Sequence, residues 1–150
     1  MFQFSARVRR VDLNRISDRL EIEDLLTRYT RAIDTGEWDR LDQVFTADAK
    51  IDYTATGGIA ATYAEVKPWL AEMLPLFPRR MHTLGQVDSQ VDGDRATVAA
   101  YFHNPMVLPQ EGGEGQLVEF GGIYHHQLRR TAAGWRSYRL LEELVWKRGM

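Results

Sequence analysis

The chain has 150 residues, which is the usual size of one domain. Its 19 basic and 21 acidic side chains leave a formal net charge of -2, so a polyanion-binding surface is not expected and nucleic acid is not a predicted partner. A 44% share of apolar residues excludes a disordered chain, and the sequence has no apolar run of the length of about 20 residues that crosses a membrane.

The sequence contains no cysteine. A disulfide framework, a thiolate metal site and a thiol nucleophile are therefore excluded, and any chemistry must come from His, carboxylate, Tyr or Ser/Thr side chains. Residues 1–7 lack the continuous apolar stretch of a secretory signal, so the cytoplasm is the expected compartment. We divide the chain into an N-terminal extension, 1–14, that could be disordered, and a single domain, 15–150.

Helical periodicity dominates the first half of the chain. Apolar residues at helical spacing over Ser17–Ile33 predict a long helix with its apolar stripe turned inward. Gly36 interrupts this pattern, and a second short helix is expected over 38–45. Alternation over 50–53 then predicts a short strand.

A third helix is predicted after residue 61. Thr62 and Glu65 have the spacing of a capping box, so the helix should begin there. Pro68 is expected to kink this helix or to mark its true first turn, and Pro75 and Pro78 should end it.

From residue 80 the pattern becomes that of strands. Turn residues separate four extended segments, at 80–91, 95–108, 116–130 and 135–146. Helices followed by a run of antiparallel strands favour an α+β domain, with the helices packed on one side of a curved sheet.

The dipeptide Asp92-Gly93 predicts a two-residue type I′ turn. If Val91 faces Asp94, counting back along both strands places His82 directly opposite His103. Opposed side chains share a face, with Cβ atoms about 4.5–5.5 Å apart, so the two histidines could act on one substrate. A one-residue bulge would change this register, and the histidines could instead be ordinary surface or core residues.

Asp34 ends the first predicted helix, where the helix dipole disfavours a negative charge. Two interpretations stay open. Asp34 could cap the second helix, since it precedes Glu37 by three residues. Alternatively, it lies at the rim of the core and orients a histidine, which fixes the tautomer and stabilises the imidazolium.

Two tyrosines in the first half are candidate hydrogen-bond donors to a substrate oxygen. Tyr29 lies on the inward stripe of the first helix, and Tyr53 alternates with Asp52 in the short strand. Either could also be a core residue whose hydroxyl group reaches the surface.

The strand over 116–130 carries two adjacent histidines. Tyr124 and His126 share a face and His125 points the opposite way, so at most one of these histidines belongs to a common pocket. If Ala132-Ala133 closes the next hairpin, His126 faces Arg139.

Two segments, Ala32–Leu41 and Lys50–Tyr53, resemble the SnoaL-like branch of the cone-shaped nuclear-transport-factor-like superfamily, and most closely the scytalone dehydratases. The resemblance spans about Ser17–Trp146 and implies a cone-shaped α+β barrel, with a deep pocket between the helices and the curved sheet. It also implies an enzyme without a cofactor that forms a dimer or trimer. A metal is not expected either, because no HxH or HxxxH spacing is present.

The same resemblance assigns site residues. It implies that Asp34 is a catalytic aspartate, His82 the histidine that it orients, His103 a second active-site histidine and Tyr53 a substrate-binding tyrosine. The full set of predicted substrate-binding residues is Tyr29, Tyr53, Tyr124, Trp38 and His126.

The predicted function is a lyase that dehydrates a small cyclic or polyketide-like hydroxy-carbonyl compound in secondary metabolism. His82 would remove the proton beside the carbonyl, His103 would protonate the departing hydroxyl, and Tyr53 would polarise the carbonyl, with Tyr29 as a further donor. Three alternatives stay open: a cyclase or isomerase with the same base, a non-catalytic small-molecule-binding or assembly domain, and, least favoured, an epoxide hydrolase. The expected partners are a small-molecule substrate and further copies of the chain, with neither nucleic acid nor membrane.

Overall fold

The computed structural model describes residues 12–150. The predicted extension over 1–14 lies outside these residues except for its end, where Leu13 already opens the first helix. The elements follow in the order α1 (Leu13–Thr35), η1 (Trp38–Gln43), β1 (Phe45–Asp52), η2 (Thr54–Thr56), β2 (Ala60–Thr62), α2 (Tyr63–Met73), η3 (Leu74–Leu76), β3 (Arg79–Arg80), β4 (Thr83–Asp92), β5 (Arg95–Leu108), β6 (Gln116–Thr131) and β7 (Gly134–Arg148), where η marks a 3₁₀ helix.

The two α-helices have clear capping signals. The side chain of Asp12 accepts the backbone N–H of Arg15 at 2.9 Å, and Gly36 ends α1 in the left-handed conformation with φ 72°. The helix is therefore longer at both ends than predicted. The predicted capping box at the start of α2 is confirmed. Pro68 lies inside that helix, so its alternative assignment to the first turn is wrong.

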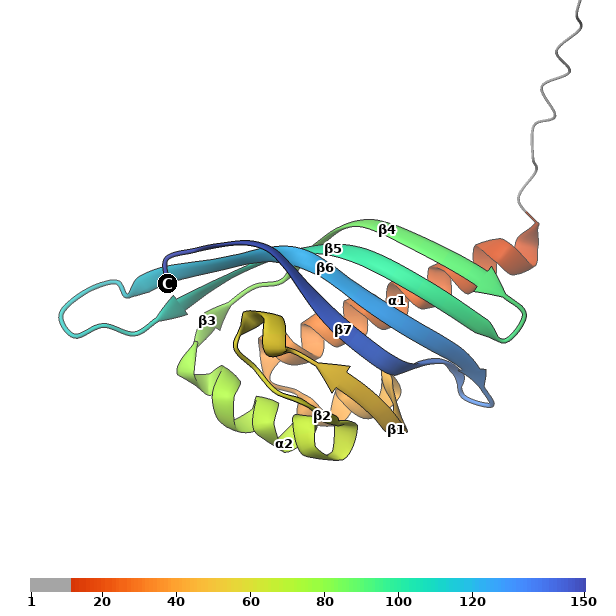
Figure 1. Cartoon of the computed structure of the whole chain (residues 1–150), viewed down its shortest axis with the longest axis horizontal. Coiled ribbons are helices and arrows are strands. Elements are labelled where there is room, and N and C mark those ends of the chain that lie inside the picture. The colour runs from red at the N-terminus through yellow and green to blue at the C-terminus, as the bar shows by residue number, and fades with distance from the viewer. Residues whose placement is uncertain (1–11) are drawn as a thin grey trace, which may run out of the picture.

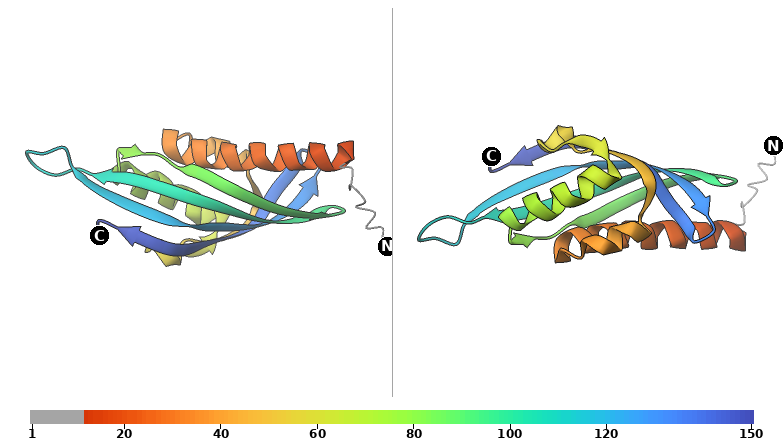
Figure 2. Two further views of the ribbon diagram at one scale, coloured as in Figure 1. Left: turned by 90° about the horizontal axis from the view of Figure 1, so that it is seen from above. Right: turned by 90° about the horizontal axis from the view of Figure 1, so that it is seen from below.

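Seven strands form one open sheet in the order β2-β1-β7-β6-β5-β3, with β4 also paired to β5. All neighbouring strands are antiparallel except β1 and β7. The long strands arch over α1 and α2, which lie on the concave side (Figures 1 and 2). The predicted α+β architecture is confirmed, although the sheet is not closed into a barrel. None of the helices within 12–150 has the length and apolar character needed to cross a membrane.

The first hairpin differs from its predicted register. Asp92 pairs with Arg95, so that Gly93 and Asp94 are the two turn residues. Gly93 has φ 57° and Asp94 has no positive φ, which is the pattern of a type II′ turn rather than type I′. The predicted pairing of Val91 with Asp94 is therefore wrong.

A bulge between Leu84 and Val87 shifts the register of this hairpin again. Beyond it, Thr83 pairs with His103, and Arg80 of β3 pairs with Met106 in the same register. His82 is therefore opposite Asn104 and not His103. Because successive side chains of a strand alternate between faces, this one-residue difference places His103 on the face away from His82.

The second hairpin closes as predicted, with Thr131 paired to Gly134. A bulge between Gln127 and Leu128 then shifts the pairing by one residue. His126 consequently pairs with Leu140, so its predicted pairing with Arg139 is wrong. The same shift places Glu142 of β7 beside Tyr124 of β6.

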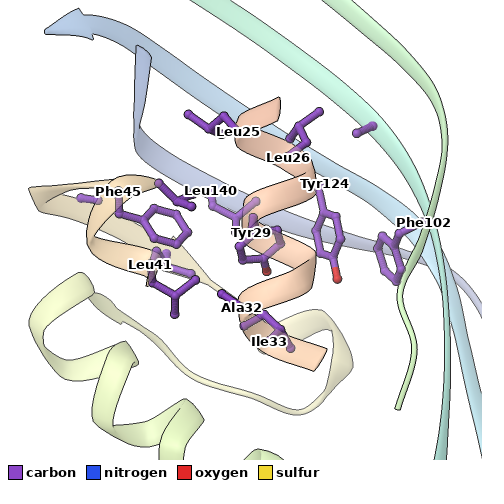
Figure 3. Packing of buried hydrophobic residues seen from close by; sticks show 14 of the residues in the cluster. Leu25, Leu26, Tyr29, Ala32, Ile33, Leu41, Phe45, Phe102, Tyr124 and Leu140 are labelled. Atoms are coloured by element: carbon purple, nitrogen blue, oxygen red, sulfur yellow. The ribbon is translucent and has the colours of Figure 1, made fainter. Parts of the chain in front are cut away.

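The hydrophobic core lies between α1 and the concave face of the sheet. The predicted inward stripe of α1 is confirmed, because its apolar members Ile22, Leu25, Leu26, Tyr29 and Ile33 are all at most 3% exposed. Figure 3 shows the rings of Tyr29 and Tyr124 side by side, with their hydroxyl ends pointing away from Leu25 and Leu26. The two tyrosine hydroxyls thus lie on the side of the core towards the C-terminal end of α1.

Candidate active site

The end of α1 and the break between β3 and β4 meet through one pair of side chains. Asp34 lies in the last turn of α1, and His82 lies in the two-residue break. Asp34 Oδ1 is 2.6 Å from His82 Nδ1, and its Oδ2 accepts the backbone N–H of His82 at 2.9 Å. The two side chains are 12% and 4% exposed, so water has little access to this pair.

This geometry decides between the two interpretations of Asp34. The 3₁₀ helix η1 begins after Glu37 without a side-chain cap, so Asp34 does not cap it. A carboxylate only accepts hydrogen bonds, so neutral His82 carries its proton on Nδ1. Its Nε2 has no hydrogen-bond partner among residues 12–150 and is left as a potential base.

Arg80 holds these elements together around the pair. Its Nε donates to the carbonyl of Ile33 at 2.8 Å, and Nη1 donates to the carbonyls of Leu74 and Phe77 at 3.1 and 2.9 Å. These bonds connect the last turn of α1, the 3₁₀ helix η3 and strand β3. Burial lowers the pKa of the Arg80 guanidinium, while the nearby Asp34 carboxylate acts in the opposite direction.

His82 borders a cavity of about 310 Å³ between the helices and the sheet. Its polar lining residues are Tyr29, Tyr53, Thr56, His82, Asn104, Tyr124 and Glu142. The apolar lining includes Ile33, Trp69, Leu70, Met73, Leu74, Phe77, Met106 and Phe120. A cavity of this size with few polar groups is typical of a site for a small molecule.

Three of the predicted substrate-binding residues line this cavity: Tyr29, Tyr53 and Tyr124. The hydroxyl oxygens of Tyr29 and Tyr53 are 2.6 Å apart. Burial raises the pKa of both phenols far above the ordinary value, so they stay neutral donors. One hydroxyl donates to the other, which leaves the second proton free for a ligand.

Glu142 is the titratable cavity residue that sequence reasoning missed. Its side chain accepts the hydroxyl of Thr56, and it lies beside Tyr124 on the neighbouring strand. Burial raises the pKa of this carboxyl to about 7, although hydrogen bonds from Thr56 and Tyr124 act against the increase. Only the bulge in the second hairpin turns Glu142 inward, and no local pattern in the sequence shows that bulge.

His103 does not reach the cavity. Its side chain is 47% exposed on the outer face, where Nε2 lies 3.0 Å from Glu119. Asn104 occupies the position opposite His82, is 8% exposed and has no hydrogen-bond partner for Oδ1 among residues 12–150. The predicted convergence of two histidines on one face is therefore wrong, and an amide stands where the second imidazole was expected.

Two other predicted binding residues lie outside the cavity lining. His126 is buried under the ring of Tyr29, with ring centroids 5.8 Å apart, and its Nδ1 is 3.0 Å from the hydroxyl of Ser137. Trp38 packs against the core below the Arg80 guanidinium. As predicted, His125 points to the opposite face from His126.

The buried side chains of His126 and Glu142 should change the pH dependence of the free energy of unfolding in opposite directions. Burial lowers the pKa of His126 from 6.5 to about 3, so its contribution is lost as the pH falls through this range. The pKa of Glu142 rises from 4.5 to about 7, so its contribution is lost as the pH rises through that range. The two contributions oppose each other between pH 4.5 and 6.5.

Single substitutions should reveal each contribution. Between pH 4.5 and 6.5, urea unfolding should show that the free energy of unfolding rises with pH in Glu142→Gln and falls with pH in His126→Phe. The two slopes should differ by about 2.7 kcal/mol per pH unit, which corresponds to two protons. Ser137 keeps its bond to the carbonyl of Arg139 in the phenylalanine variant. Parallel curves for the two variants would contradict the assignment.

Within 12–150, no three His, Cys, Asp or Glu side chains are grouped so that they could hold a metal ion. The polar groups of the cavity are neutral donors, one amide and the His82 and Glu142 side chains. The chemistry that these residues offer is proton transfer and hydrogen bonding.

Comparison with known proteins identifies the family. A model described as the SnoaL-like domain matches residues 14–140. The chain belongs to this family. An uncharacterized protein of Mycobacterium tuberculosis is 45% identical to this SnoaL-like domain over 136 residues, which cover 90% of each chain. The predicted resemblance is confirmed.

Solved structures give the same fold. The Kfla4162 protein of Kribbella flavida is 27% identical, with a TM-score of 0.81 and coverage of 89% of this SnoaL-like domain and 94% of that chain. A hexachlorocyclohexane dehydrochlorinase of Novosphingobium barchaimii has 20% identity, a TM-score of 0.78 and coverage of 93% and 94%. A scytalone dehydratase-like protein of Novosphingobium aromaticivorans has 16% identity, a TM-score of 0.78 and coverage of 90% and 89%.

Proposed function

We propose that this SnoaL-like domain is a cofactor-independent lyase that eliminates water from a small hydroxy-carbonyl compound. One observation carries the proposal: a buried histidine, His82, is held by two hydrogen bonds to a single carboxylate, Asp34, at a mostly apolar cavity. Its other ring nitrogen has no hydrogen-bond partner in the part of the chain that the structure describes, 12–150. This arrangement is suited to a general base, because the carboxylate fixes the tautomer and stabilises the imidazolium that forms.

The tyrosine pair provides the complementary group. The free hydroxyl proton of Tyr29 or Tyr53 donates to the carbonyl oxygen of the substrate and stabilises negative charge as it develops there. His82 Nε2 takes the proton from the carbon beside the carbonyl. The hydroxyl group on the next carbon then leaves with the proton of the imidazolium, so that a carbon–carbon double bond and one water form and His82 returns to its neutral state.

A single histidine acts twice in this scheme, since His103 lies on the outer face. An imidazole can both accept a proton and return it, which suits one side chain to both steps. Asn104, across from His82, can bind the departing hydroxyl but cannot protonate it.

The relatives support an elimination. The names of two structural neighbours, a dehydrochlorinase and a scytalone dehydratase-like protein, denote loss of hydrogen chloride and of water. The cavity of about 310 Å³ and its aromatic lining favour a small cyclic or polyketide-like substrate. The homo-oligomer and the cytoplasmic location stay predictions.

Mass spectrometry tests the reaction class. The purified protein is incubated with a panel of small β-hydroxy ketones and aromatic polyketides, with Asp34→Asn as the control. Loss of one water in the wild-type sample alone supports the lyase. A rearranged product of unchanged mass would instead indicate an isomerase or cyclase, an alternative that the absence of a second imidazole near His82 keeps open. Tight binding of an unchanged compound would indicate a binding domain.

Replacement of Tyr53 by phenylalanine should lower kcat by about 10²–10³-fold, as for other donors to a developing oxyanion. The ring stacks on Trp69 at an interplanar angle of 25°, with centroids 6.2 Å apart, and the variant keeps this contact. Steady-state kinetics and a melting curve measure the two effects separately. An unchanged kcat would remove Tyr53 from the reaction.

A further inference from the structure

Glu142 is a buried carboxyl group that the elimination described above does not use. It is 7% exposed, lines the same cavity as His82, and forms no ion pair with any basic side chain of residues 12–150. A buried carboxylate without a cation is costly, so such a group either keeps its proton or receives a cation from a ligand.

The groups that surround Glu142 favour the protonated form of its carboxyl group. Those that face it or act on it from neighbouring elements are Thr56 of η2, Asp52 of β1, Tyr53 directly after β1, Tyr29 of α1 and Tyr124 of β6. They are hydroxyl groups and one carboxylate. His82, which is hydrogen-bonded to Asp34, lines the same cavity. Burial and the Asp52 carboxylate raise the pKa of Glu142 to about 7.

Glu142 and His82 lie on opposite sides of the cavity floor. His82 belongs to the edge formed by β3 and β4, and Glu142 belongs to β7, so strands β5 and β6 lie between them. Three strand spacings correspond to about 14 Å along the sheet. A ligand in the cavity therefore meets a base at one end and a carboxyl group among hydroxyls at the other.

We propose that Glu142 is a carboxylic acid that donates its proton to a neutral carbonyl oxygen of the ligand, and so selects ketones and related acceptors at the end of the cavity opposite His82. This inference rests on the proposed function for the class of ligand, a hydroxy-carbonyl compound, and adds no step to the elimination. The carbonyl oxygen beside the reacting carbon is bound by the tyrosine pair, and Glu142 binds a carbonyl oxygen at the other end of the ligand.

A binding experiment tests the donor without requiring turnover. The affinities of 1-indanone and 1-aminoindane, a ketone and an amine of one size, are measured by calorimetry at about pH 5.5 and about pH 8.5, on either side of the pKa of Glu142. The wild-type protein should bind the ketone about tenfold more tightly at the lower pH, where the acid can donate. Glu142→Gln, whose amide donates at every pH, should bind it equally at both.

Three results would overturn the proposal: ketone affinity that does not change with pH, the same change in Glu142→Gln, or preferred binding of the amine with loss of its affinity in that variant. The last result would make Glu142 a counter-ion for cations. Proteolytically stable variants with native circular dichroism are required for the comparison. Carbon-13 NMR of glutamate-labelled protein is a second readout, and Glu142→Gln assigns the signal of Glu142. The Glu142 carboxyl should titrate near neutrality. A midpoint at the ordinary glutamate value would also overturn the proposal.

The two proposals fail separately. If no β-hydroxy ketone loses water but the ketone binds as described, the lyase is wrong and the donor stands. If water is lost but the binding and the NMR titration do not depend on Glu142, the lyase stands and the donor is wrong.

Discussion

Replacement of Asp34 by asparagine is expected to lower kcat by about 10²–10⁴-fold, the usual contribution of a general base. The carboxylate accepts both the Nδ1 proton and the backbone N–H of His82. In asparagine, one of these two partners must face an NH₂ group instead. If that partner is Nδ1, the proton moves to Nε2 and the base is lost, as for the corresponding substitution in other His–Asp pairs. If it is the backbone N–H, two donors oppose each other and the loop shifts.

Two controls make this result specific. His125→Ala removes another histidine–carboxylate pair, with Nε2 2.6 Å from Glu143, but on the outer face of the sheet, and kcat should stay unchanged. The double variant of Asp34→Asn and His82→Ala should be no slower than His82→Ala alone, since the two residues act as a unit. Near-normal turnover of either single variant, with the fold intact, would rule out the proposed base.

Replacement of Trp135 by alanine is expected to lower the free energy of unfolding by about 3–5 kcal/mol, the usual cost of removing a buried aromatic side chain. Trp135 is 1% exposed, and its Nε1 donates to Asp18 of α1 at 3.1 Å. Its backbone N–H donates to Glu21 of α1 at 2.7 Å, and the Arg130 guanidinium lies over its ring. The substitution thus loosens the contact that fastens the N-terminal half of α1 to the β6–β7 hairpin. Urea unfolding measures the change.

Trp135→Phe is the matched variant, because it keeps most of the buried ring and removes only the indole N–H. We expect a loss of about 1–2 kcal/mol, the contribution of one hydrogen bond to a charged group together with a small packing defect. Equal effects of the two substitutions would show that packing of the ring does not stabilise this end of the molecule.

Local sequence signals predicted the elements well because each acts over a few residues. The capping box at Thr62, the glycine after α1 and the turn residues of the second hairpin all lie where their helices and strands begin or end. The inward stripe of α1 follows from helical periodicity alone. The pairing of Asp34 with His82 was anticipated as one of two interpretations, since a carboxylate at a helix C-terminus needs a partner.

The register of the strands was predicted wrongly. The predicted meeting of His82 with His103 depended on Asp92-Gly93 as the two turn residues and on strands without bulges, and both assumptions were wrong. A second bulge turned Glu142 towards Tyr124. Bulges produce the curvature that lets the sheet arch over the helices, and their positions depend on all strands together rather than on one segment.

The amino-acid sequence by itself thus determined the order and type of the long elements, the α+β fold class and the presence of a carboxylate and a histidine suited to act together. Only the tertiary structure decided which side chains of the strands face the cavity. The physical reason is the two-residue period of a strand: a shift of one position moves a side chain from one face of the sheet to the other. One bulge therefore exchanged His103 for Asn104, and another brought Glu142 into the site.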